Sequence, residues 1–479
     1  MYTQLFIDGQ WCDPVIPATL PAHNPATEEV IAAVAAGSAR DVERAVRAAR
    51  AALAGWRARS GSERAVYLHA IAQAIRERAE HIAALSARNN GKPLAEARID
   101  IADAAATYEY YAGLAQQLDA RQDAPVSLAA EGYASYTRLE PVGVAALIVP
   151  WNFPLTTSAW KVAPALAAGC TVVLKPSEVT PLPELELGAI AQAVGLPAGV
   201  LNIINGSGTE VGAPLCAHPL VDKISFTGSN RVGAAVMVQA AQQIKRVSLE
   251  LGGKSPLIVF DDADLSEALA WILGGIFYNC GQVCSATSRL LVQEGIAHRL
   301  LEQLKEATEA LQLGDALAPG VNMGPMTSAV QLATVLRYIE RGRSEGLKLL
   351  TGGQRAAGFS RGWFVEPTIF TDVPTDSALW REEIFGPVLC VRTFATEAQA
   401  VALANDSDFG LAAGIISADS GRARRVARLL DAGHIWINSL QVVFPETAWG
   451  GFKRSGIGRE LGPWGLAAYT EIKQITAPA

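Results

Sequence analysis

The chain has 479 residues, of which 50% are apolar and 18% charged, and its formal net charge is −7. This length exceeds one ordinary hydrophobic core, so two or three domains are expected. An acidic chain without a basic block offers no surface for nucleic acid, and its most apolar run, 142–155, is too short to span a membrane. The N-terminus has no signal-peptide pattern, and six unpatterned cysteines suit a reducing compartment, which predicts a cytoplasmic protein.

The first part of the chain is predicted to be helical. Between about residues 39 and 118, Ala, Arg, Glu and Leu dominate, and apolar residues recur at helical spacing, as at Val42, Val46 and Ala49. From 138 to 232 the pattern changes, and short β-rich runs alternate with helix-like stretches. The runs are 144–149, 171–174, 200–204 and 223–226.

This alternation is typical of βαβ units and predicts a parallel sheet. A second series of the same kind begins after Glu250 with the run 256–260 and continues to Asn438. We therefore predict two α/β domains side by side. The Gly-rich region 449–465 and the polar stretch 119–137 fit neither domain and predict a third, smaller unit.

Cys284 follows a Gly-Gln turn at the end of an apolar helical run, where a thiol can act as a nucleophile without a catalytic triad. Its attack on an aldehyde would give a thiohemiacetal, loss of hydride to a nicotinamide would leave a thioester, and water would release the acid. Glu250, at the join of the two α/β segments, is the candidate general base. Taken singly, an isolated Cys is more often a buried apolar residue and an isolated Glu a solvated one.

Seven segments occur together in an order and spacing that resemble the aldehyde dehydrogenase family over nearly the whole chain. They are Pro150-Trp-Asn-Phe-Pro154, Lys175-Pro-Ser-Glu178, Phe226-Thr-Gly-Ser229, Leu249-Glu-Leu-Gly-Gly253, Gly281-Gln-Val-Cys284, Glu383-Ile-Phe-Gly-Pro387 and Trp449-Gly-Gly451. The resemblance implies that Cys284 is the nucleophile and Glu250 the base. The Asn152 side chain and the Cys284 backbone N–H would form the oxyanion hole. For Lys161, in the matching helix, a structural salt bridge and a functional role are both open.

The resemblance also implies the family's α/β fold, with a Rossmann-like NAD-binding domain, a second α/β catalytic domain and a small β oligomerisation flap. The corresponding limits are 1–122 and 143–249 for the NAD-binding domain, 250–446 for the catalytic domain, and 123–142 with 447–479 for the oligomerisation domain. Because the flap of this family pairs with a neighbouring subunit, a homodimer or homotetramer is expected.

A loose glycine turn, Gly206-Ser207-Gly208 with Gly212, follows the apolar run 200–204, as a dinucleotide-binding turn does. By resemblance, the segment 226–229 would bind phosphate at a helix N-terminus. A carboxylate at Glu178 would accept bonds from the adenine ribose and repel a 2′-phosphate, which favours NAD over NADP, although Lys175 is also suited to pair a phosphate.

The same resemblance assigns the remaining cofactor contacts. Glu383 and Phe385 would hold the ribose on the nicotinamide side, whereas outside this context they would be read as a surface Glu and a core Phe. The full predicted set is Ile148, Trp151, Lys175, Ser177, Glu178, Gly208, Gly212, Phe226, Gly228, Ser229, Val232, Leu251, Glu383 and Phe385.

Within the family, the chain is most similar to the betaine aldehyde and aminoaldehyde dehydrogenases, including those of plants. Glu96, Asp100 and Asp103 fall on one face of a predicted helix and match acids at the mouth of the substrate tunnel, where they would anchor an ammonium group. The alternative is a solvated acidic helix face. Four aromatic residues match the tunnel lining and would bind such a cation through their ring faces, unless they are ordinary core residues. They are Phe153, Trp160, Tyr278 and Trp449.

Several positions depart from the plant pattern. His434 stands where a small or branched apolar residue decides whether betaine aldehyde fits, and a protonated histidine would repel a cation. Tyr278, Phe153 and the pair Phe444-Pro445 also differ. We therefore expect slim ω-aminoaldehydes, such as 3-aminopropanal and 4-aminobutanal, in preference to betaine aldehyde. Asn89 replaces an Asp of a monovalent-cation site, and no metal is predicted.

Other interpretations stay open. Cys280, one helical turn before Cys284, is either a packed thiol or the partner in a reversible disulfide that protects the nucleophile. A semialdehyde dehydrogenase would need Arg or Lys to pair a substrate carboxylate, and a CoA-acylating enzyme would not need Glu250. A structural protein that retains the fold would not need the set of Asn152, Glu250 and Cys284.

Overall fold

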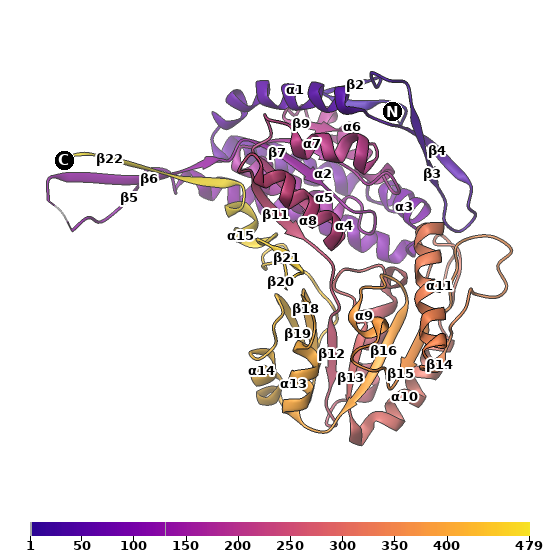
Figure 1. The fold of residues 1–479 in the computed structure, drawn as a ribbon. Coiled ribbons are helices and arrows are strands. Elements are labelled where there is room, and N and C mark those ends of the chain that lie inside the picture. Colours follow the sequence, from indigo (N-terminus) through magenta and orange to yellow (C-terminus); the bar gives the residue numbers. More distant parts are fainter. Residues whose placement is uncertain (1, 130) are drawn as a thin grey trace.

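A computed structural model describes residues 2–129 and 131–479 and shows two α/β lobes with a long β arm projecting from the first (Figure 1). The first lobe contains an eight-stranded sheet with the order β2-β1-β9-β8-β7-β10-β11-β21. Its five central strands are parallel. Their bounds are β7 Val144–Ile148, β8 Thr171–Lys175, β9 Leu201–Ile203, β10 Lys223–Thr227 and β11 Arg246–Glu250. The outer strands are antiparallel: β1 Leu5–Ile7 lies next to β9, and β2 Gln10–Cys12 and β21 Gly456–Ile457 form the two edges.

Strand order in this sheet reverses between β7 and β10, because the chain first builds outward through β8 and β9 and then returns to the other side. Every residue of β7, β8 and β10 is buried, as expected for parallel strands covered on both faces. Ligands of such doubly wound sheets bind at the carboxyl ends of the strands, near this reversal. The fold therefore places a binding crevice at the ends of β7 and β10.

Helices cover both faces of the first sheet (Figure 1). The predicted helical region forms four helices, and five further elements follow. They are α1 Ala39–Arg57, α2 Gly61–Glu77, α3 Ala79–Asn90, α4 Leu94–Asp119, α5 Thr156–Ala168, α6 Leu182–Ala193, a π-helical turn Gly208–Gly212, α7 Ala213–Ala217 and α8 Asn230–Ala241. A hairpin of β3 Thr19–His23 and β4 Val30–Ala35 packs beside α3.

The second lobe contains a seven-stranded sheet with the order β14-β15-β16-β13-β12-β18-β19. Its strands are β12 Pro256–Val259, β13 Arg289–Gln293, β14 Lys348–Thr351, β15 Thr368–Thr371, β16 Val388–Phe394, β18 Ala412–Ile416 and β19 His434–Ile437. Its helices are α9 Leu265–Phe277, the 3₁₀ turn Tyr278–Gly281, α10 Glu294–Glu309, α11 Ala329–Ser344, α12 Ala378–Arg381, α13 Glu397–Asn405 and α14 Ser420–Ala427. A separate apolar core lies within this lobe.

The projecting arm joins two segments that are far apart in the sequence. It consists of β5 Ala124–Pro125, β6 Tyr133–Pro141 and β22 Thr470–Pro478, with β6 and β22 paired along their whole length. Helix α15, Gly462–Ala467, precedes β22, and a short pair of β17 Phe409–Gly410 and β20 Phe452–Lys453 lies nearby. The predicted fold class is confirmed, whereas the exact domain limits stay a prediction. Over the described residues, no helix combines the length and apolarity that a membrane span requires.

Candidate active site

A cavity of about 650 Å³ lies between the lobes, at the carboxyl ends of β7, β10 and β11. The structure brings the predicted nucleophile, base and oxyanion donor to its wall, although they come from different lobes. Cys284 follows α9 of the second lobe, Glu250 ends β11, and Asn152 follows β7. These three residues can therefore act on one substrate.

Cys284 is presented by a tight left-handed turn. Asn279, Cys280 and Gly281 have φ values of 47°, 54° and 72°. These values lie in the left-handed region of the backbone, which residues other than Gly and Asn rarely adopt. A Cβ added at Gly281 would lie 2.3 Å from the backbone of Gly386, so only glycine fits there. The turn redirects the chain from α9 into the cavity.

The pKa of the Cys284 thiol is raised well above its usual value, first by burial and then by the charges of Glu250 and Glu383. The protonated thiol therefore predominates at neutral pH, and nucleophilic attack requires a group that takes its proton. Burial makes Cys284 depend on a base.

Glu250 is suited to that task. It is 4% exposed and its Oε1 atom has no hydrogen-bond partner among the described residues. Burial, followed by the neighbouring Glu460, raises its pKa well above the usual value. In its ionised form, a carboxyl group with a raised pKa is a stronger proton acceptor than an exposed one.

Lys161 reaches the site only through Glu460, which the sequence did not single out. The Lys161 ammonium is fully buried, pairs with the Glu460 carboxylate and donates to Ser225 Oγ at 3.2 Å. Glu460 lines the cavity, whereas Lys161 does not. The structural and functional interpretations of Lys161 are therefore compatible, because its salt bridge holds a cavity carboxylate. Glu460 stands outside the seven recognised motifs, so no local pattern marked it.

The three predicted tunnel acids have separate surroundings. Asp100 and Asp103 line the cavity, whereas Glu96, which was expected beside them, does not. The Glu96 carboxylate accepts a bond from the Asn279 backbone N–H at 2.9 Å, which draws it toward the nucleophile turn. Burial raises its pKa to about 8. Asp103 accepts a bond from the indole N–H of Trp160 at 3.1 Å.

Lys92 changes the charge balance of the tunnel. Its ammonium is buried, pairs with Asp100 and lies 3.9 Å from the centre of the Phe153 ring. The protein's own cation therefore neutralises Asp100 and occupies one face of a predicted cation-binding ring. Of the two acids of this helix face on the cavity wall, Asp103 is therefore the one that Lys92 does not pair. Sequence reasoning missed Lys92 because it precedes α4 and does not share the helix face.

The four predicted aromatic residues all line the cavity. Phe153 and Tyr278 lie nearly parallel with their centres 6.4 Å apart, and Trp160 meets Trp449 edge-on at 5.6 Å. The loop after β19 adds an apolar rim, which sequence reasoning noted only as a departure at Phe444. The rim side chains are Leu440, Val442, Val443 and Phe444.

His434 does not line the cavity. Its ring packs behind the lining, 5.5 Å from the Trp449 ring and 4.6 Å from the Trp436 ring. Burial lowers its pKa below the usual value, so the imidazole is neutral at neutral pH. The condition for repulsion of a cationic substrate, a protonated His434, is therefore not met at neutral pH, and an effect of this residue on substrate size would pass through the ring that it packs against, that of Trp449.

The predicted cofactor residues gather at the carboxyl ends of the parallel strands, as ligand positions in doubly wound sheets do. Lys175 ends β8 and donates to Glu178 at 3.0 Å, which holds the carboxylate in place. Ser229 caps the N-terminus of α8. The remaining members of the group follow the same edge: Ile148, Trp151, Ser177, Gly208, Gly212, Phe226, Gly228, Val232 and Leu251.

Glu383 and Phe385 bring the second lobe to this edge. The Glu383 carboxylate accepts a bond from the Gly253 N–H at 3.0 Å, and burial raises its pKa to about 7. Phe385 meets Trp151 edge-on at 5.2 Å. Both lie on the cavity wall with Gly228, Ser229 and Leu251, so the cofactor crevice and the cavity above Cys284 are continuous.

Two further predictions concern single residues. Asn89 donates its amide to the carbonyls of His23 and Val179, both at 3.2 Å. Across 2–129 and 131–479, no cluster of His, Cys, Asp and Glu could hold a metal.

Cys280 directs its thiol at Met326, 3.5 Å away in the second core, whereas Cys284 packs against the first core. The packed-thiol interpretation therefore has more support than a disulfide.

Comparisons with known proteins agree with this geometry. The aldehyde dehydrogenase family matches residues 11–475, and the chain therefore belongs to this family. It is 52% identical over 478 residues to a chloroplastic aminoaldehyde dehydrogenase of Arabidopsis thaliana, covering 99% of this chain and 95% of that one. It is 49% identical over 479 residues to a chloroplastic betaine aldehyde dehydrogenase of Beta vulgaris, with coverage of 99% and 96%.

Solved structures show the same fold. The NAD⁺ complex of betaine aldehyde dehydrogenase from Staphylococcus aureus has a TM-score of 0.97 and 40% identity, and covers 99% of this chain and 95% of its own. The NAD⁺ complex of an aldehyde dehydrogenase from Bacillus cereus has a TM-score of 0.97 and 41% identity, with coverage of 100% and 97%. These neighbours bear out the predicted enzyme class and the expectation of NAD.

The prediction of a cytoplasmic protein is wrong on this comparison. Several similar relatives are named as chloroplastic or peroxisomal enzymes, among them those of Arabidopsis thaliana and Malus domestica. Cysteine usage and the first residues were a poor guide, because a reducing interior is not confined to the cytosol.

We predict that the affinity for cationic aldehydes depends on the protonation of Asp103. Burial raises the pKa of this carboxyl group to about 7, so the carboxylate is present above that pH and lost below it. The KM for betaine aldehyde, whose quaternary ammonium does not titrate, should fall several-fold between about pH 6 and about pH 8. The KM for neutral propanal should lack this change. A pH-dependent fall that persists in Asp103→Asn would contradict the assignment.

Proposed function

We propose that this enzyme oxidises ω-aminoaldehydes such as 3-aminopropanal and 4-aminobutanal to their carboxylic acids, with NAD⁺ as the acceptor. The observation that carries the proposal is the placement of Asp103 in an aromatic-lined cavity that also contains Cys284. A carboxylate and ring faces attract an ammonium group, while the aldehyde end of a short chain approaches the thiol. None of the described residues that line the cavity is Lys or Arg, which disfavours substrates with a carboxylate.

The residues support a two-stage reaction. Glu250 takes the thiol proton as Cys284 Sγ bonds to the carbonyl carbon, and the Asn152 amide with the Cys284 backbone N–H stabilises the oxyanion. The cofactor, held by the residues at the carboxyl ends of the parallel strands, would supply the acceptor for the hydride that this carbon loses as the carbonyl reforms as a thioester. Glu250 passes the thiol proton to solvent before the second stage. It then takes a proton from water, whose oxygen bonds to the thioester carbon; the C–S bond breaks, the acid leaves, and Glu250 returns that proton to the Cys284 thiolate. This need for a base disfavours a CoA-acylating enzyme.

NAD is proposed over NADP because of Glu178. Its carboxylate is held by Lys175 beside the predicted adenine ribose site. An anionic 2′-phosphate there would meet a negative charge, and the lysine that could pair it already has a partner.

Betaine aldehyde is the second candidate, and the neutral His434 favours it. Because this imidazole carries no charge and lies behind Trp449, it does not repel a trimethylammonium group electrostatically. The space available in front of Trp449 then decides between the two substrates. The similarity to enzymes named as betaine aldehyde dehydrogenases is compatible with either outcome.

The projecting arm supports a homodimer or homotetramer. Its strands expose apolar side chains, with Tyr133 57% and Ile472 73% exposed. The pair of β6 and β22 extends beyond the lobes, so it buries little of its own surface within one chain (Figure 1). A second copy of the chain would cover it.

A substrate panel tests the proposed function. The kcat/KM measured by NADH formation should be at least about tenfold higher for 3-aminopropanal and 4-aminobutanal than for propanal, because one charged contact is worth about that factor. Asp103→Asn should reduce the difference in kcat/KM between the aminoaldehydes and propanal. Glu109→Gln, which alters a solvent-facing acid of the same helix outside the cavity, should not. Equal values for charged and neutral aldehydes would contradict the proposal.

The ring of His434 is predicted to limit the room available to Trp449. His434→Ala should raise kcat/KM for betaine aldehyde relative to 3-aminopropanal by about tenfold, the usual value of a small change in pocket volume. His434→Gln, which keeps most of the side-chain volume, is the matched control. An unchanged ratio in the alanine variant would show that this position does not control substrate size.

Glu250→Gln should lower kcat by about two to four orders of magnitude, the usual contribution of a general base. Because Glu250 serves both the attack of the Cys284 thiol and the hydrolysis of the thioester, both stages should slow, and NADH formation in a single turnover would measure the loss in the first stage. A variant that keeps wild-type turnover would exclude Glu250 as the base.

A further inference from the structure

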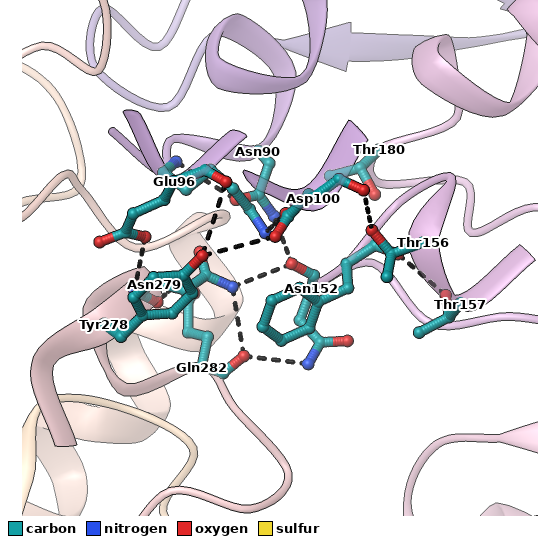
Figure 2. Close-up of polar contacts among 12 residues, drawn as sticks. Asn90, Glu96, Asp100, Asn152, Thr156, Thr157, Thr180, Tyr278, Asn279 and Gln282 are labelled. Atoms are coloured by element: carbon teal, nitrogen blue, oxygen red, sulfur yellow. Dashed lines mark hydrogen bonds and ion pairs between the residues drawn. The ribbon is translucent and has the colours of Figure 1, made fainter. Parts of the chain in front are cut away.

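Asn279 connects both sides of the reaction centre. This residue of the nucleophile turn is 1% exposed, and its amide nitrogen donates to the backbone oxygen of Asn152 at 2.9 Å and to that of Gln282 at 3.3 Å (Figure 2). Asn152 belongs to the first lobe and Gln282 to the loop that ends at Cys284. A single side chain therefore links the oxyanion donor to the nucleophile loop.

The Gln282 carbonyl also determines how the Asn152 amide faces. It accepts a bond from Asn152 Nδ2 at 3.0 Å (Figure 2). An amide nitrogen carries two hydrogens, so one is held by Gln282 and the second is left for the oxyanion. Gln282 is fixed in turn, because its own side chain donates to the Asn279 carbonyl at 2.9 Å and accepts from the Thr327 N–H at 2.9 Å.

Glu96 completes the arrangement from the tunnel helix. Asn279 has a left-handed backbone, and its N–H has no helical partner; it donates instead to Glu96 Oε2 at 2.9 Å (Figure 2). A buried N–H needs such an acceptor. Glu96 therefore serves the turn and not the cavity, although it lies on the same helix as Asp100 and Asp103.

We propose that Glu96 and Asn279 are positioning residues: Glu96 anchors the left-handed turn, and Asn279 sets the Asn152 amide against Cys284. The inference rests on the proposed roles of Asn152 and Cys284. It assigns to Glu96 a task different from binding the substrate cation, and it makes the acceptor oxygen of Glu96, not its charge, the required feature.

Two substitutions of Glu96 separate these tasks. Glu96→Gln keeps an acceptor oxygen and should retain most of the turnover that Glu96→Ala loses. The alanine variant should lower kcat about ten- to hundredfold, the usual effect of misplaced reacting groups, equally for 4-aminobutanal and propanal. If Glu96→Gln instead raises KM for 4-aminobutanal and not for propanal, Glu96 binds the substrate cation and the proposal is overturned.

Asn279→Gly keeps the left-handed backbone and removes the amide. It should lower kcat by about a hundredfold with little change in KM. Asn152→Ala should cost two to three orders of magnitude by itself, and adding Asn279→Gly to it should cost little more, because Asn279 acts through Asn152. Independent, multiplicative losses would overturn the proposal. Cys280→Ala is the control, since it changes the same turn outside this network.

A thiol-labelling measurement keeps this inference separate from the proposed substrate. The rate at which iodoacetamide alkylates Cys284, followed by mass spectrometry, depends on the order of the turn and on no aldehyde. It should change in Glu96→Ala and Asn279→Gly, and match the wild type in Glu96→Gln and Cys280→Ala. Unchanged rates in all four would overturn the positioning role even if turnover is lost. A wild-type enzyme inactive on aminoaldehydes would refute the substrate and leave the labelling result to decide the positioning role.

Discussion

Removal of water from the cavity between the lobes controls the chemistry of every ionisable group on its wall. Burial is the largest cause of the raised pKa at Cys284, Glu250, Asp103 and Glu383. Desolvation disfavours the charged form of each acid, so the same constraint has different results. It keeps the Cys284 thiol protonated until a base acts, and it raises the pKa of the candidate base Glu250. It also brings the pKa of Asp103 to about 7.

The protein offsets other buried charges with partners that a substrate does not displace. Lys92 neutralises Asp100, and Lys161 pairs with Glu460 of the cavity wall. Such pairs are held in place because removing one member would leave the other charged and desolvated. In the proposed recognition of a cation, the groups that would take part are therefore Asp103 and the ring faces that Lys92 does not cover.

The order of the turn before Cys284 matters because the catalytic groups come from two lobes. Cys284 packs against the core of the first lobe. Hydrogen bonds across the boundary, from Asn279 to Asn152 and from Asn152 to Gln282, add direction to that contact. The sharp turn at this point requires a left-handed backbone at Asn279 and Cys280, a conformation that costs free energy.

Motif order predicted the family, and strand–helix alternation predicted the doubly wound sheet. Parallel strands present their carboxyl ends at one edge, so the gathering of Lys175, Ser229 and Glu250 followed from their places after apolar runs. Helical spacing placed Asp100 and Asp103 on one face and included Glu96 with them, because spacing alone does not show where a flexible side chain ends.

By itself, the sequence singled out the candidate catalytic residues, since Cys284, Glu250 and Asn152 lie in motifs that local order makes recognisable. Only the tertiary structure decided the partners of those residues. The ion pairs of Lys92 and Lys161, the position of His434 behind Trp449, and the bond from Asn279 to Glu96 join residues from different elements. Charge and protonation depend on distance in space and on burial, which packing sets and the order of residues along the chain does not.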